Sequence, residues 1–240
     1  MALNKWLMAF YLMCASKKGY SAHQLHRTLG VTYKTAWFMA HRIREAMRCG
    51  GLATPTAMGG NGKTVEIDET FIGQKGNRTS NARKARGGYR QKQAVLTLID
   101  REGEARSFHI ENCKFTTVGP IIKANIARES KVATDEAAQY RSLHKHFAEH
   151  EAVNHSVEEW ARDDFHVNNC ESYFSIFKRG MKGVYQHCSE KHVHRYLAEF
   201  DFRYNNRSAK GIEDQQRTSN ALLQIEGKRL TYRRIDRVES

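Results

Sequence analysis

Residues 64–72 read Thr-Val-Glu-Ile-Asp-Glu-Thr-Phe-Ile, a run rich in β-branched and aromatic residues with Asp68 at its centre. Such a run is typical of a strand inside a sheet. An unpaired charge is costly to bury, so Asp68 is a candidate for a functional site. Because side chains alternate along a strand, Glu66 shares a face with Asp68 and Glu69 points the other way.

Two further acids stand in patterns that also predict rigid elements. Asp135 ends a segment, 131–134, that predicts a short buried strand, and Glu171 lies early in an amphipathic helix predicted over 169–182. Thirty-six positions separate Asp135 from Glu171. Hard divalent cations prefer oxygen ligands, and a pair of them can drive phosphoryl transfer. Asp68, Asp135 and Glu171 are therefore the candidate metal-binding and catalytic residues, for two Mg²⁺ ions or for Mn²⁺, which accepts the same ligands.

The charge of the chain favours a polyanionic partner. The 240 residues carry a formal net charge of +13, with 40% hydrophobic residues. Seven basic residues and no acid lie between positions 74 and 92, and residues 1–50 carry eight Lys or Arg against Glu45 alone. Clusters of this kind favour nucleic acid. No apolar run is long enough to cross a bilayer, and the five scattered cysteines form no metal-binding pair, which favours the reducing cytosol.

Residues 1–50 predict a small all-α module. Helices are expected over 4–16, from a capping box at Ser21 through 29, and, after a turn at Gly30, over 33–48. A short helix, a glycine turn and a longer helix form a helix-turn-helix. Its last helix would offer four residues to DNA: Lys34, Thr35, His41 and Arg42. The alternative is a three-helix bundle in which the same pattern serves packing alone.

The rest of the chain predicts an α/β domain over 63–207, after a Gly-rich linker at 51–62 and before a basic C-terminal extension at 208–240. The predicted elements are strands at 64–72, 94–100, 104–110, 131–134 and 152–156, and helices at 116–128, 136–149, 169–182 and 189–205. Three hairpin-connected strands followed by alternating helices and strands indicate a mixed five-stranded sheet with flanking helices.

The chain resembles the DDE transposases of bacterial insertion sequences over nearly its whole length. Five stretches carry the resemblance: 65–73, 134–135, 153–156, 166–180 and 200–207. The resemblance implies an RNase H-like, integrase-like fold with Asp68, Asp135 and Glu171 as the metal-binding triad. Transposases of this group commonly begin with a cysteine zinc ribbon, which this sequence lacks.

The same resemblance implies a transposase that binds the double-stranded ends of its element, cleaves a strand and joins the freed end to target DNA. A homo-oligomer on DNA, in the cytoplasm at the nucleoid and away from membranes, is expected. The residues expected to neutralise phosphates are Arg83, Lys84, Arg86, Lys178 and Arg179. Auxiliary roles at the site are expected for Glu66, His166 and Asn169.

Two other functions fit the same sequence. A metal-dependent nuclease of the same fold would cut DNA without joining it. A non-catalytic helix-turn-helix regulator would bind DNA and show no Mg²⁺-dependent cleavage. Three acids in this arrangement have no use in a regulator, so the sequence favours an enzyme.

Overall fold

The protein is built around one mixed sheet. The computed structural model describes residues 1–48, 56–73, 92–153 and 165–228. The five strands are β1 (Thr64–Ile72), β2 (Gln93–Asp100), β3 (Ala105–Ile110), β4 (Lys131–Asp135) and β5 (Glu149–Val153). They lie in the order β3-β2-β1-β4-β5, with β1, β2 and β3 antiparallel and with β1, β4 and β5 parallel. This mixed sheet with helices on its faces is the predicted RNase H-like fold.

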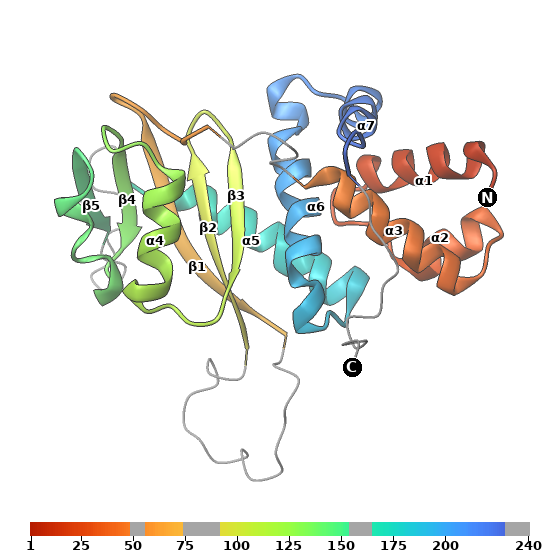
Figure 1. The fold of residues 1–240 in the computed structure, drawn as a ribbon, viewed down its shortest axis with the longest axis horizontal. Helices are drawn as coiled ribbons and strands as arrows, with labels where there is room; N and C mark the ends of the chain where they lie inside the picture. The colour runs from red at the N-terminus through yellow and green to blue at the C-terminus, as the bar shows by residue number, and fades with distance from the viewer. Residues whose placement is uncertain (49–55, 74–91, 154–164, 229–240) are drawn as a thin grey trace, which may run out of the picture.

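Helices cover both faces of the sheet (Figure 1). On one face, α4 (Phe115–Asn125) packs its apolar side against alternate residues of the central strands, such as Ile67 and Leu96. On the other face, α5 (Asn168–Gly180) and α6 (Val193–Asn205) form a second core. Burial of both faces explains why β2 consists entirely of buried residues.

The N-terminal helices follow the capping signals in the sequence. They are α1 (Leu3–Ala15), α2 (Ala22–Leu29) and α3 (Tyr33–Met47). The capping box at Ser21 is present, and Gly30 takes a left-handed conformation between α2 and α3. α6 stands between these helices and the sheet in Figure 1.

The C-terminal region contains a helix that we did not predict from sequence. α7 (Asp214–Leu223) packs on α1, and its residue Ala221 belongs to the core of the N-terminal helices, together with Phe202 of α6. The hydrophobic periodicity of α7 is weak, because its buried residues are only Arg217 and Ala221. None of the helices in the described ranges is long and apolar enough to cross a membrane.

The prediction of a helix over 136–149 is wrong. The segment forms two short 3₁₀ turns, Ala138–Tyr140 and Leu143–Lys145, before β5 begins at Glu149. Tyr140, Leu143 and Phe147 are buried in the core under α4. Their spacing imitates a helical face, but the chain must return within a few residues to start the parallel strand β5.

The second half of the predicted linker packs on the sheet domain. Met58 is 2% exposed and forms a bridge with Ile126, and the N–H of Gly59 donates to Asp100 at 3.0 Å. The positive φ of Gly59, 77°, favours glycine at this close approach. Residues 51–55 lie outside the described part of the chain.

Candidate active site

The register between β1 and β4 places two of the three candidate acids side by side. Ile67 pairs with Thr134 in the parallel ladder, so Asp68 and Asp135 are the next residues on adjacent strands. Val65 and Val132 pair and face α4. By alternation, Asp68 and Asp135 lie on the opposite face, which α5 covers.

The two carboxylates repel one another. Burial, and then the charge of Asp135, raise the pKa of Asp68 to about 7. Asp68 Oδ1 accepts a hydrogen bond from the Glu69 N–H at 2.7 Å, and Asp135 Oδ1 accepts one from the Ala137 N–H at 3.1 Å. Both side chains are therefore oriented by the backbone, and the charge of Asp135 disfavours ionisation of Asp68.

Glu171 lies on the helix that covers this face of the sheet. It lies in the first turn of α5, is exposed, and contributes to the raised pKa of Asp68. An acid in the first turn interacts favourably with the helix dipole. Glu171 is therefore close enough to Asp68 to influence its pKa.

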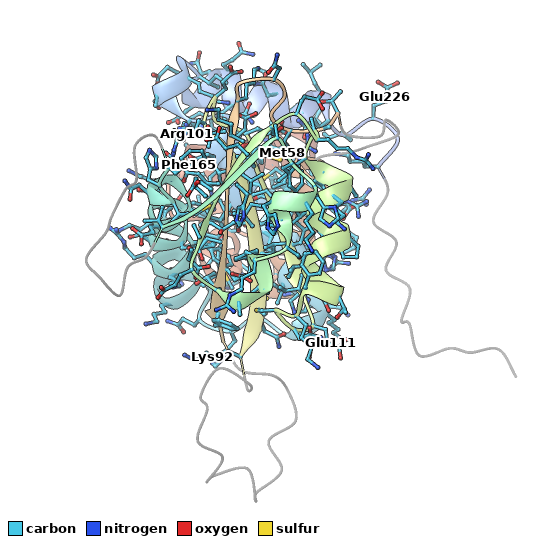
Figure 2. The ribbon with its side chains drawn as sticks, turned by 90° about the vertical axis from the view of Figure 1, so that its left-hand side faces the viewer. Met58, Lys92, Arg101, Glu111, Phe165 and Glu226 are labelled. Carbon is cyan, nitrogen blue, oxygen red and sulfur yellow. The ribbon has the colours of Figure 1, made fainter. Side chains whose placement is uncertain are left out.

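Glu66 fixes the start of α5. Its side chain is wholly buried, and its oxygens accept from the N–H of Asn169 at 2.9 Å, from Asn169 Nδ2 at 2.7 Å and from the Cys170 N–H at 3.4 Å. His166 Nδ1 and Arg101 Nε lie 3.1 Å and 3.5 Å from Glu66 Oε1. Figure 2 shows Arg101 and Phe165 toward the same end of the molecule. Because donors surround Glu66, it positions α5 and is not an open metal ligand.

The remaining acid of the first strand belongs to the other face. Glu69 Oε1 accepts from Gln139 Nε2 at 3.0 Å, on the side of the sheet that carries Tyr140. Burial, opposed by hydrogen bonds from Tyr140 and Gln139, raises the pKa of Glu69. Glu69 is thus directed away from Asp68, as the alternation predicted.

The donor chemistry of the site suits a hard divalent cation. Asp68 and Asp135 supply carboxylate oxygens from rigid strands, and their mutual repulsion is the kind that a cation relieves. Among the described residues, no three His, Cys, Asp or Glu side chains converge closely enough to hold an ion by themselves. The third ligand would come from the exposed Glu171, with water completing the coordination.

Basic residues line a groove beyond the C-terminal half of α5. Lys178 and Arg179 are exposed, and Arg179 is held by hydrogen bonds to Ser175. A cavity of about 880 Å³ is lined by Lys178, Lys182 and Lys92, the last of which Figure 2 places at the opposite end from Arg101. The predicted contacts Arg83, Lys84 and Arg86 lie outside the described residues.

One predicted DNA contact on α3 is wrong. His41 is wholly buried, with its ring 4.1 Å from that of Trp37 and 5.0 Å from that of His192. Burial, and then the positive charge of Arg44, lower the pKa of His41 to about 2. α6 and the turn before it cover this face of α3, which the sequence of α3 alone does not reveal.

The other predicted contacts on α3 are accessible to different degrees. Lys34 is exposed at the N-terminal end of the helix, where a recognition helix meets DNA bases. Thr35 is half-buried, and its N–H bonds the capping Thr32 hydroxyl at 3.2 Å. Arg42 is exposed and lies against aromatic rings, 5.9 Å from Trp6 and 5.5 Å from Phe38.

Two polar residues of α6 that sequence reasoning missed attach this helix to the sheet. Asp201 accepts from the N–H and hydroxyl of Ser107 and from the Tyr173 hydroxyl. Asn205 both accepts from the N–H and donates to the carbonyl of Ala105. They satisfy backbone and side-chain groups on the edge strand β3. The sequence feature that could have indicated these contacts is the presence of polar residues among the aromatic residues of the predicted helix, within 200–207.

A buried ion network joins the N-terminal helices to α6. Glu199 is 0% exposed and pairs with Arg44 of α3 at 2.7 Å and with Arg203 at 2.5 Å. The Tyr185 hydroxyl also donates to Glu199 at 2.5 Å. Burial would raise the pKa of Glu199, but Arg203 and Arg44 hold it below the ordinary value. The N-terminal module is thus fixed to the helix that braces the sheet.

The sheet order and the helices on both faces of the sheet define an RNase H-like fold. Residues 59–205 match the ISXO2-like transposase domain. The chain belongs to this family of transposases of insertion sequences. A relative from Halobacterium salinarum, described as an uncharacterized protein in transposable element ISH50, is 30% identical over 216 residues, which cover 84% of this chain and 69% of the relative.

A solved structure is also similar, more distantly. The crystal structure of a pre-cleavage Mos1 transpososome is 13% identical, covers 89% of this chain and 76% of its own, and has a TM-score of 0.36.

Proposed function

We propose that the protein is a DDE-type transposase that binds the double-stranded ends of its element, frees a 3′-OH by strand cleavage and joins this end to target DNA. The observation that carries the proposal is the register that sets Asp68 beside Asp135, on the face covered by α5. Membership of the transposase family supports the choice of DNA as substrate.

In this proposal Asp68, Asp135 and Glu171 hold two Mg²⁺ ions, and Mn²⁺ can replace them. The bound ions would neutralise the phosphate, activate the attacking oxygen and stabilise the leaving oxygen. Glu66 keeps α5, and with it Glu171, at a fixed place above the strand pair. Lys178 and Arg179 contact phosphates of the strand that is cut.

The chemistry is two displacements at phosphorus. In the first, water attacks the phosphorus atom, the bond to the 3′-oxygen breaks, and a 3′-OH is left. In the second, this hydroxyl attacks a phosphodiester of the target, so that one phosphodiester forms as another breaks. The protein acts as an oligomer on DNA, because two element ends must be joined to one target.

The test uses the full chain, Mg²⁺ and duplexes that carry the terminal repeats flanking the gene, with nicked and joined products separated on a gel. Asp68→Asn and Asp135→Asn should remove both products and leave duplex binding intact. Glu149→Gln is the matched control, because Glu149 forms an exposed pair with Lys131 at the other end of β4 and β5. Cleavage without joining would indicate a nuclease, and binding without cleavage a regulator.

A further inference from the structure

A second cavity lies beside the first half of α5. It has a volume of about 500 Å³ and is bounded by the end of α1, the first half of α5, the second half of α6 and the start of α7. Figure 1 shows α1, α6 and α7 meeting beside the sheet. Cavities of this size are in the usual range for small ligands, about 300–1,000 Å³.

Arg203 lines this cavity as a buried cation. It is 7% exposed, and its Nη1 donates to Glu199 and, at 3.4 Å, to the Met13 carbonyl. Its Nε and Nη2 have no hydrogen-bond partner within the described ranges of the chain, but both atoms are buried, and the guanidinium carbon lies 4.5 Å from the centre of the Phe200 ring. Arg203 therefore contributes its positive charge to the cavity but does not offer these two N–H groups to a ligand.

The charges around Arg203 do not balance. Glu199 is shared between Arg203 and Arg44, so this buried network holds two cations and one anion. Lys17 and Arg207 add two more positive charges to the cavity wall. The acid on the wall, Asp214, is already paired with Arg217 at 2.5 Å. The cavity therefore favours an anionic ligand.

The remaining wall suits an aromatic ring and a sugar. Phe200, Tyr204 and Ile176 provide apolar surface, and the Ser172 and Ser208 hydroxyls provide polar groups. We propose that this cavity binds one nucleotide unit, with its phosphate at Lys17 and Arg207 and its base against the apolar wall. Base–aromatic contact and cationic contact to phosphate are the usual means of holding an unstacked nucleotide.

The position of the cavity connects it with the proposed active site, and this inference rests on the proposed function for its biological role. Asn169 and Ser172 line the cavity, and Glu171 lies between them on α5. A duplex does not fit a space of this size, whereas one nucleotide displaced from the stack does. The nucleotide comes either from the DNA strand near the cut or from the free pool, and the chemistry of recognition is the same.

The first experiment measures binding of dAMP and of inorganic phosphate to the full chain by calorimetry. Lys17→Ala and Ser172→Phe should each raise the dissociation constant for dAMP about fivefold or more, because one removes a charge and the other fills the cavity. Both positions are exposed and tolerate substitution. Lys18→Ala is the matched control, because Lys18 is exposed, adjacent in sequence and outside the cavity wall.

The second experiment identifies the source of the nucleotide. It uses the Asp68→Asn protein, so that loss of cleavage does not enter the result, and duplexes with 2-aminopurine at successive positions near the element end. A fluorescence increase at one position that Ser172→Phe abolishes assigns the cavity to DNA. Binding of dAMP without such an increase assigns it to a free nucleotide. If neither signal depends on Lys17 and Ser172, the inference is wrong, whether or not the protein cleaves DNA.

Discussion

The buried carboxylate of Glu66 on β1 accepts the backbone N–H of Asn169 at 2.9 Å, across 103 positions of sequence. This contact connects the strand that carries Asp68 to the helix that carries Glu171. Glu66 thereby acts as a cap for α5, since Val167 at the N-cap position forms no side-chain cap. The geometry of the candidate site depends on this pair.

Replacement of Glu66 by glutamine should therefore loosen the site. A glutamine keeps one acceptor and places an amide donor opposite the donors of Asn169 and Cys170, which should cost about 1–3 kcal/mol of unfolding free energy. Strand cleavage should fall while duplex binding is retained. Urea denaturation and amide exchange at Asn169 and Cys170 measure the effect. Equal stability and equal exchange in Glu66→Gln and the wild type would contradict the capping role.

The network around Glu199 predicts an asymmetry between two variants. Glu199→Gln leaves Arg44 and Arg203 buried without an anion and should cost about 3–5 kcal/mol. Arg44→Met leaves Glu199 paired with Arg203 and should cost less. Chemical denaturation of the two variants gives the comparison. If Arg44→Met lost more unfolding free energy than Glu199→Gln, the number of buried charges left without a partner would not control stability.

The pKa of Asp68, raised to about 7, predicts a pH dependence of the metal-free protein. The folded state holds the proton more tightly than the unfolded state, so the wild type loses stability as pH rises from about 4 to 7. Asp68→Asn removes this loss and should be the more stable protein at pH 8, with the difference vanishing near pH 4. Melting temperatures of the pair measure it.

The stability of the two proteins must be compared as a difference at each pH. Burial raises the pKa of Asp201 to about 6, so Asp201 also lowers the stability of both proteins as pH rises. Mg²⁺ should raise the melting temperature of the wild type at pH 8 and have little effect on Asp68→Asn. A Mg²⁺ effect of equal size in both proteins would remove Asp68 from the ligand set.

The burial of His41 predicts the opposite pH dependence. Its folded pKa of about 2 lies below the ordinary value, so stability is lost as pH falls from about 6.5, because the unfolded state takes up the proton. His41→Phe should be more stable than the wild type at pH 5. This difference in stability should be larger at pH 5 than at pH 8. Thermal unfolding at the two pH values measures it.

The same variant separates packing from DNA contact. His41→Phe should bind duplex DNA as the wild type does, whereas Lys34→Ala should bind more weakly. In Lys34→Ala, the slope of the logarithm of the binding constant against the logarithm of the salt concentration should be smaller by about one. Weaker DNA binding by a stable His41→Phe protein would restore His41 as a contact.

The sequence by itself determined the elements that local chemistry specifies. Capping residues defined α2 and α3, apolar runs defined β1 and β2, and the positions of Asp68, Asp135 and Glu171 marked the candidate site. Alternation along β1 was sufficient to separate Asp68 from Glu69, because a strand has a fixed period of two.

Tertiary structure decided what depends on contacts between distant segments. The pairing of Ile67 with Thr134 brought Asp68 beside Asp135, and Asn169 turned Glu66 into a helix cap. Packing of α3 on α6 buried His41, which a helix considered alone would expose. The spacing of Tyr140, Leu143 and Phe147 indicated a helix, but the short return to β5 left two turns. Periodicity shows which residues are buried, while the path of the chain decides the partners they are buried against.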